Sequence, residues 1–143
     1  MSNRSIVMLI NSSRSEAQGA AQEITSALTK AGIAVLSPQD SAQSGVEIVL
    51  VLGGDGTILR GAEIALDRSI PLLGINLGHV GFMAEVDSFT FQDVAQAIID
   101  KDYVLDQRML LSFQVKRENS VIQSGWSLNE VSIERKSTTM LEL

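Results

Sequence analysis

Residues 48–60 read IVLVLGGDGTILR, and this change from aliphatic to glycine-rich sequence decides the fold. The residues before the glycines are all valine, isoleucine or leucine, which indicates a strand buried on both faces. Beyond the turn, apolar residues recur on one face of a helix: Ile58, Leu59, Ala62, Ala65 and Leu66. Thr57 is suited to be the N-cap of that helix. The stretch therefore predicts a strand, a tight turn and a helix, with Asp55 at the tip of the turn.

The glycine-rich turn has two interpretations. Glycine lets a ligand approach the backbone closely, and a turn that opens a helix presents unpaired N–H groups that attract phosphate. Asp55 would then accept a proton from a hydroxyl group or hold a metal–phosphate unit. Alternatively, the turn only connects a strand to a helix, and Asp55 supports the helix cap. The spacing of the residues alone does not separate these two interpretations.

Composition limits the classes of protein to be considered. The chain has 143 residues, enough for one domain or for one domain and part of another. Its 17 acidic and 11 basic residues give a net charge of −6, which argues against nucleic acid or an anionic membrane as partner. Cysteine is absent and His79 is the only histidine, which excludes a cysteine or histidine-cluster metal site. No apolar run approaches the roughly 18 residues of a membrane span, and we expect a cytoplasmic protein.

Strand and helix patterns alternate over the first part of the chain. Aliphatic runs predict strands over residues 5–10, 33–36, 46–52 and 70–75. Helical spacing follows the first, third and fourth of these runs. This order predicts an α/β domain over residues 1–102, with a mostly parallel, Rossmann-like sheet that helices cover on both faces.

The helix ends carry their own signals. Ser13 or Ser15 is suited to cap the helix expected over residues 17–31, which Gly32 would terminate. Ser88 or Thr90 is suited to open the last helix of this part of the chain.

The pattern changes after residue 102. Residues 109–116 alternate between apolar and polar side chains, which indicates a half-buried strand, and residues 117–120 form a plausible turn. A further strand is expected over residues 126–135, and residues 140–143 read as the start of another. Residues 103–143 are therefore expected to be the first strands of an all-β domain, which the chain leaves incomplete or which a partner completes.

Three motifs together resemble one family of enzymes. They are GGDGT at residues 53–57, NLGHVGF at residues 76–82 and LNEV at residues 128–131. GGDG alone is shared with diacylglycerol kinases, sphingosine kinases and phosphofructokinases, whereas the other two motifs are far more selective. With all three in this order, the chain resembles the N-terminal portion of an NAD kinase of the bacterial type.

The resemblance implies an activity and its cofactors. A phosphoryl group would pass from ATP, or in some members polyphosphate, to the 2′-hydroxyl of the adenosine ribose of NAD, giving NADP. The cofactor would be Mg²⁺ or another divalent metal ion with ATP, and the full-length protein would be a homo-dimer or homo-tetramer. The chain lacks the family's later TPTGSTAY segment, so we expect it to be an incomplete fragment. The alternatives are a non-catalytic nucleotide-binding module, or a GGDG kinase that acts on a lipid or a sugar.

The resemblance also implies site residues. Asp55 would be catalytic, taking the proton from the attacking hydroxyl or orienting it. The implied substrate- and nucleotide-binding residues are Gly53, Gly54, Gly56, Thr57, Arg60, Asn76, Phe82, Asn129 and Glu130. No direct metal ligand is assigned.

Several of these assignments have a structural alternative. Phe82 could be a core residue instead of a wall of the adenine pocket, and Asn76 could be only a turn former. Arg60 could pair with Glu63 at i+3 instead of facing a phosphate. Asn129 and Glu130 fall on opposite faces of a regular strand, so only a bulge or a strand end would let both reach one ligand.

Overall fold

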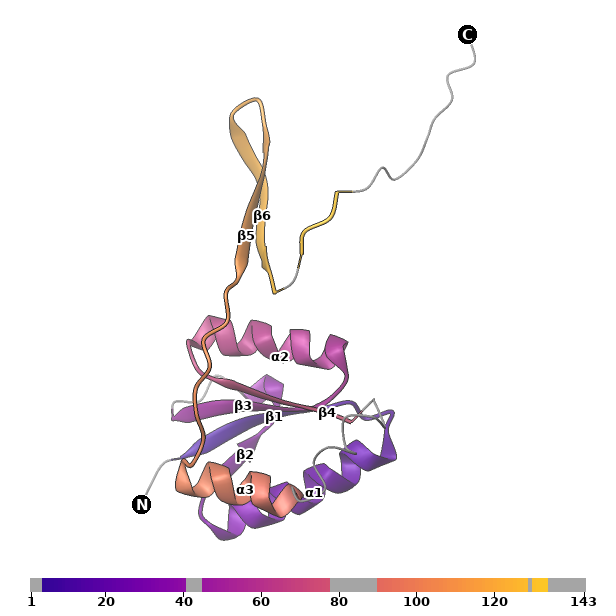
Figure 1. Cartoon of the computed structure of the whole chain (residues 1–143), viewed down its shortest axis with the longest axis vertical. Helices are drawn as coiled ribbons and strands as arrows, with labels where there is room; N and C mark the ends of the chain where they lie inside the picture. The colour runs from indigo at the N-terminus through magenta and orange to yellow at the C-terminus, as the bar shows by residue number, and fades with distance from the viewer. Residues whose placement is uncertain (1–3, 41–44, 78–89, 129, 134–143) are drawn as a thin grey trace. The chain divides into compact units, whose positions relative to one another are not determined.

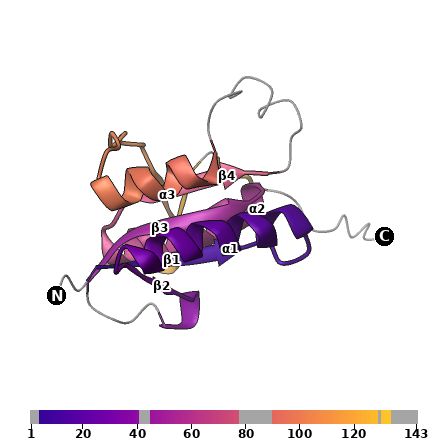
Figure 2. The ribbon, with the colours of Figure 1, turned by 90° about the horizontal axis from the view of Figure 1, so that it is seen from below.

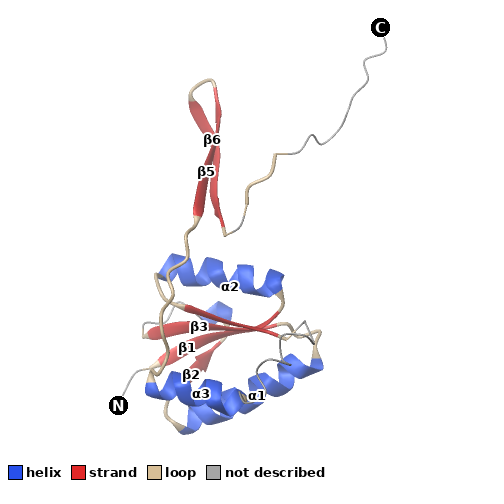
Figure 3. Cartoon of the chain, in the orientation of Figure 1, coloured by secondary structure: helices blue, strands red, loops and turns tan. Residues whose placement is uncertain are grey.

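The computed structural model of the chain describes residues 4–40, 45–77, 90–128 and 130–133. In chain order, the elements are β1 (Ser5–Ile10), α1 (Ser15–Lys30), β2 (Ala34–Leu36), the 3-10 helix η1 (Pro38–Asp40), β3 (Val46–Gly53), α2 (Asp55–Arg68), β4 (Leu72–Asn76), α3 (Phe91–Asp100), β5 (Leu111–Arg117) and β6 (Ser120–Ser127) (Figures 1 and 3). Contacts group the chain into two compact units, Met1–Leu105 and Asp106–Leu143. The division into domains at residue 102 stays a prediction.

The first unit is built on a parallel four-stranded sheet with the order β2-β1-β3-β4. Helices α1 and α3 lie side by side on one face of this sheet, and α2 covers the other face (Figures 1 and 2). The alternation of strands and helices and the mostly parallel sheet covered on both faces are therefore confirmed.

Strand β3 forms the centre of two hydrophobic cores. Ile48, Leu50 and Leu52 pack in the core beneath α1 and α3, whereas Val49 and Val51 pack in the core beneath α2. None of these five side chains is more than 3% exposed. A parallel strand covered on both faces needs apolar side chains at consecutive positions, which explains the unbroken aliphatic run that precedes the glycines.

The predicted helix caps are correct in part. Gly32 has a left-handed φ of 78° just after α1, as expected for a residue that ends a helix. Thr90 caps α3 through a capping box with Asp93, which confirms one of the two predicted caps. The other, Ser88, lies outside the described residues.

Two cap predictions are wrong. Arg14 is the N-cap residue of α1, and Ser13 instead donates both its N–H and its hydroxyl to Asn11 Oδ1. Gly54 is the N-cap residue of α2, so Thr57 lies inside the first turn of that helix. In both cases the side chain of the N-cap residue makes no hydrogen bond to the first turn of the helix.

The second unit contains an antiparallel hairpin of β5 and β6. Glu118 and Asn119 form its turn with φ values of 47° and 67°, at the position where the sequence predicts one. Most side chains of both strands are exposed, so the expected half-buried face is not buried within this unit. The strand predicted over residues 126–135 is wrong beyond Ser127, because β6 ends there and residues 128 and 130–133 are not in a strand. The strand expected from residue 140 lies outside the described residues.

Candidate functional site

The carboxyl ends of β1 and β3 mark a switch in the topology of the sheet. The two strands are parallel neighbours, and Asn11 N–H continues their ladder by donating to Leu52 O at 2.9 Å. After β1 the chain enters α1 on one face, whereas after β3 it enters α2 on the other face (Figure 1). In open α/β sheets the crevice between two such diverging connections is the usual place for a ligand.

The turn after β3 presents backbone donors and one carboxylate at this crevice. Gly54 is extended, with φ −92° and ψ −173°, and its carbonyl accepts hydrogen bonds from the N–H groups of Thr57 and Ile58 at 3.0 Å. Asp55 is the first residue of α2, and its side chain is exposed. No side chain caps the N-terminus of α2, so its first N–H groups have no partner from a capping residue.

Packing among the described residues explains the glycine at position 53, but not those at positions 54 and 56. A Cβ atom on Gly53 would lie 2.9 Å from Thr57 Oγ1 and 3.2 Å from Asn11 Cβ, so the neighbouring turns require a glycine there. A Cβ atom on Gly54 or Gly56 would meet nothing within 4 Å, and neither residue has a positive φ. Glycine inside a helix costs roughly 1 kcal/mol relative to alanine. Packing within the described residues therefore gives no reason for Gly54 or Gly56, and the space beside them is open to a ligand.

Close packing fixes α2 on the sheet behind this turn. A Cβ atom on Gly61 would overlap Val51 Cγ2, and one on Gly74 would lie 3.2 Å from two carbon atoms of Ile58. These glycines let the helix approach β3 and β4 closely. The first residue of α2, Asp55, is consequently held at a fixed place above the end of β3.

The connection between β1 and α1 forms the other wall of the crevice. Arg14 N–H donates to Asn11 O at 3.1 Å, and Gln18 Nε2 donates to Ser12 O at 2.8 Å. The Arg14 side chain leaves this loop, and its Nη1 donates to Leu77 O at 3.1 Å. The sequence analysis missed Asn11 and Arg14. The signal that could have found them is their place directly after a strand that neighbours the strand ending in GGDG.

The structure brings some of the predicted site residues together. Gly53, Gly54, Asp55, Gly56 and Thr57 form one turn, and Asn76 ends β4 directly opposite Gly53 in the strand register. Arg60 lies one turn further along α2, with an exposed side chain. It forms no ion pair with Glu63, although both residues belong to the described part of α2.

The remaining predicted residues are not placed at this crevice. Phe82 and Asn129 lie outside the described residues. Glu130 belongs to the second unit, where its carbonyl accepts a hydrogen bond from Ser127 Oγ at 2.6 Å. It lies beyond the end of β6, and not in the regular strand that the sequence suggested.

A partly buried ion-pair network lies at the opposite edge of the sheet, where the strands begin. Arg4 Nη2 lies 2.6 Å from Glu47 Oε1, and Lys101 Nζ lies 3.4 Å from Glu47 Oε2. Arg4 also donates to the carbonyls of Ile98 and Ile99 at the end of α3, at 2.7 and 2.8 Å. Burial raises the pKa of Glu47, but the hydrogen bonds and charges of Arg4 and Lys101 outweigh it and hold that pKa below its ordinary value. The hydrogen bond to Glu47 raises the pKa of Arg4.

Metal-binding clusters and membrane-spanning helices are both absent from the described residues. They contain no group of three or more histidine, cysteine, aspartate or glutamate side chains that could hold a metal ion. Among the described helices, none is long and apolar enough to cross a membrane.

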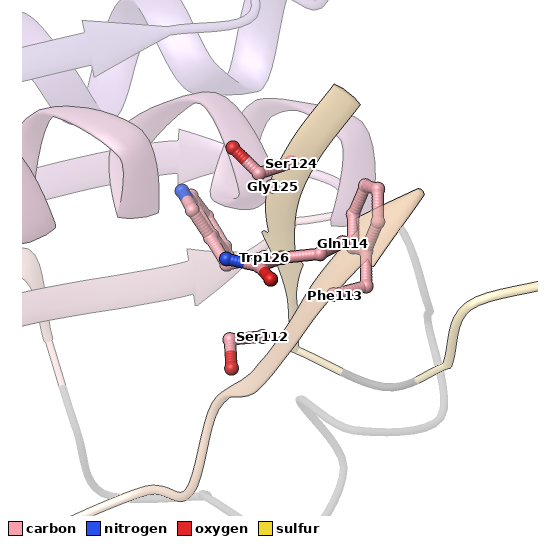
Figure 4. Close-up of a pocket in the computed structure, with 6 residues that line it drawn as sticks. All are labelled: Ser112, Phe113, Gln114, Ser124, Gly125 and Trp126. Carbon is pink, nitrogen blue, oxygen red and sulfur yellow. The ribbon is translucent and has the colours of Figure 1, made fainter. Parts of the chain in front are cut away.

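A shallow hollow of about 650 Å³ lies on the hairpin of the second unit. It is lined by Ser112, Phe113, Gln114, Ser124, Gly125 and Trp126 (Figure 4). Phe113 and Trp126 lie on opposite faces of the hairpin, and the Phe113 ring covers Gly125, where a Cβ atom would lie 2.7 Å from it. The hollow contains none of the predicted site residues, so it does not compete with the crevice at the end of β3.

Comparison with known proteins points to one family. Residues 13–103 match the model of the ATP-NAD kinase N-terminal domain. An NAD kinase of Rhodococcus erythropolis is 45% identical over 105 residues, which cover 73% of this chain and 33% of that protein. An NAD kinase of Mycolicibacterium paratuberculosis is 36% identical over 161 residues, covering 92% of this chain and 52% of that protein. One of Corynebacterium efficiens is 52% identical over 95 residues. The chain thus spans between about a third and about half of the length of these relatives.

Proposed function

This chain belongs to the ATP-NAD kinase family, and we propose that the protein transfers a phosphoryl group from ATP to the 2′-hydroxyl of the adenosine ribose of NAD, giving NADP. The observation that carries the proposal is the position of Asp55 and its open glycines at the switch point of the sheet. Polyphosphate is the alternative phosphoryl donor.

In this proposal Asp55 acts on the attacking hydroxyl group. Phosphoryl transfer depends mainly on positioning and on neutralising charge, so one carboxylate that orients or deprotonates the alcohol is sufficient from the protein. Asp55 is the first residue of α2, so its side chain lies beside the N-terminal N–H groups of that helix. The exposed side chain leaves room for a ribose to reach it.

The same turn would hold phosphate oxygens. The N–H groups at the start of α2, which no side chain caps, and the open space beside Gly54 and Gly56 support this role. Thr57 would contribute its hydroxyl, although in this structure Oγ1 lies against Gly53. Arg60, which lies one turn further along α2, would also bind a phosphate group.

The other predicted residues would recognise the dinucleotide. Asn76 is supported by its place opposite Gly53. Phe82 as a wall of the adenine pocket, and Asn129 and Glu130 as residues that reach one ligand, stay predictions.

Mg²⁺ would enter with the nucleotide. Magnesium is usually held by one or two carboxylates together with substrate phosphates, and does not need a cage of protein ligands. The described residues contain no such cage, and Asp55 is the one carboxylate in the turn. The residues therefore fit a metal ion bound mainly by phosphate, which would supply charge neutralisation at the transferred group.

The assembly and location of the whole protein are also proposals. A homo-dimer or homo-tetramer, an all-β domain that begins after residue 102, and a cytoplasmic location with neither nucleic acid nor membrane as partner remain as the sequence predicts them.

Replacement of Asp55 tests the proposed function directly. Asp55→Asn should lower kcat for NADP formation at least about a hundredfold, because the amide no longer accepts the proton. Asp67→Asn is the matched control, since it removes an exposed carboxylate near the other end of the same helix. Turnover should be assayed with NAD, diacylglycerol and fructose 6-phosphate, and the fold checked by circular dichroism. Wild-type turnover by Asp55→Asn would refute the role of Asp55, and turnover of the lipid or sugar alone would refute the substrate.

A further inference from the structure

A hydrogen bond of Arg14 links the segment that follows β1 to the segment that follows β4. Arg14 follows β1 and Leu77 follows β4, and the strand order places β3 between these two strands. The hydrogen bond from Arg14 Nη1 to Leu77 O, 3.1 Å long, therefore connects two segments that flank β3. Leu77 comes directly after Asn76, which pairs with Gly53, so this contact lies at the end of the sheet where the turn after β3 begins.

No acid among the described residues pairs with Arg14. Within the described residues Arg14 forms no ion pair, whereas Arg4 at the other end of β1 is paired with Glu47. A guanidinium group has five N–H donors in a planar fork. Leu77 O accepts from Nη1, and no other described residue accepts a hydrogen bond from this side chain. Within the described part of the chain, the other N–H groups of this guanidinium therefore have no protein acceptor.

The backbone beneath Arg14 is already ordered. Asn11 Oδ1 accepts two hydrogen bonds from Ser13, and Gln18 Nε2 bonds to Ser12 O. The bond to Leu77 O fixes the far end of the arginine side chain as well. Little conformational entropy is then left for a ligand to remove, which favours binding by this group.

We propose that Arg14 is a further substrate-binding residue of this site, and that its unused guanidinium N–H groups donate to a phosphate group of a bound nucleotide. The inference rests on the proposed function. Arginine suits this task because its planar fork matches the oxygens of phosphate and keeps its charge at every physiological pH. Both substrates carry phosphate groups, the triphosphate of ATP and the pyrophosphate of NAD, and the binding chemistry is the same for either.

Two variants of Arg14 test the proposal in the protein at its natural length. Arg14→Gln removes the charge, and we expect the KM for ATP or for NAD to rise about tenfold or more, as for loss of a charge-assisted hydrogen bond. Arg14→Lys keeps the charge but not the fork, so a smaller rise in the same KM is expected. A rise for ATP alone assigns the donor triphosphate, and a rise for NAD alone assigns the pyrophosphate.

One control separates this role from a general effect of charge. Lys30→Gln removes one positive charge from the opposite end of α1. It should leave the two KM values unchanged. If Arg14→Gln does not fold, Arg14→Lys alone decides, with thermal unfolding recorded beside the kinetics. Unchanged KM values for both substrates in the folded variants would overturn the proposal. Absence of NADP formation by the wild-type protein would instead refute the proposed function.

Discussion

The parallel sheet has one edge where its strands begin and one where they end, and the arginines at these two edges have different partners. At the edge where the strands begin, Arg4 bonds to Glu47 and to two carbonyls of α3, and Lys101 joins the same carboxylate. At the edge where the strands end, Arg14 bonds to one carbonyl and to no acid among the described residues. At the first edge the protein itself pairs the arginine with an acid, whereas at the second no described acid pairs with the arginine.

The helix termini repeat this difference. Thr90 and Asp93 form a capping box at the start of α3, as expected of a structural helix end. The start of α2 has a glycine as its N-cap residue, no capping side chain and an exposed acid. A capping side chain is therefore missing at the point where the proposed chemistry takes place, which is the pattern expected of a functional site.

The largest expected effect on stability comes from removing the ion pair and hydrogen bonds of Arg4. Arg4→Ala should lower the free energy of unfolding by roughly 3 kcal/mol, because it leaves Glu47 partly buried and unpaired and frees two carbonyls of α3. The catalytic constants of the molecules that remain folded should not change. Urea unfolding followed by circular dichroism measures the first effect. A decrease in the free energy of unfolding of less than about 0.5 kcal/mol would show that the protein holds Arg4 no more strongly than Arg14.

A smaller effect should appear as a change in pH dependence. Because the folded-state pKa of Glu47 lies below its unfolded value, its ion pairs contribute stability above the unfolded pKa, and this contribution is lost as the pH falls through the folded pKa. Glu47→Gln should remove this loss and flatten the acid limb of the stability curve. Urea midpoints measured between neutral and acidic pH test this expectation. A limb of unchanged slope in the variant would assign the acid sensitivity to other carboxylates.

The smallest effect is expected in the glycine-rich turn at residues 53–57, where a substitution should raise the free energy of unfolding instead of lowering it. Gly56→Ala should raise the free energy of unfolding by up to about 1 kcal/mol, because alanine favours the helix and its Cβ meets no atom within 4 Å. The same change should reduce turnover, since the methyl group occupies the space proposed for phosphate. Gly19→Ala is the matched control, a glycine of α1 with equally open surroundings. Full activity in Gly56→Ala would mean that the open space is not used.

Sequence patterns predicted most of the first unit because its elements are local. Aliphatic runs and helical spacing locate β1, β3, α1 and α2 without knowledge of their neighbours. The GGDGT turn was also found, since its residues are consecutive. The helix caps were less predictable, because Gly54 caps α2 through its backbone conformation and not through a side chain.

The missed features depend on distant contacts. Arg14 reaches a carbonyl 63 positions away, and Arg4 reaches Glu47 43 positions away. No periodicity reports such pairs, because strand order decides which loops meet. The strand predicted over residues 126–135 failed for the reverse reason, since alternation alone does not supply the neighbouring strand that a ladder needs.

The two hydrophobic cores of the sheet have a mechanical consequence. One wall of the crevice continues into α1, which is anchored in the core shared with α3, and the other continues into α2, which is anchored in the core on the opposite face. A nucleotide seated between these walls would join two bodies that otherwise meet only through the sheet. Binding of a nucleotide should therefore restrict motion in the helices on both faces of the sheet, including residues that do not contact the ligand.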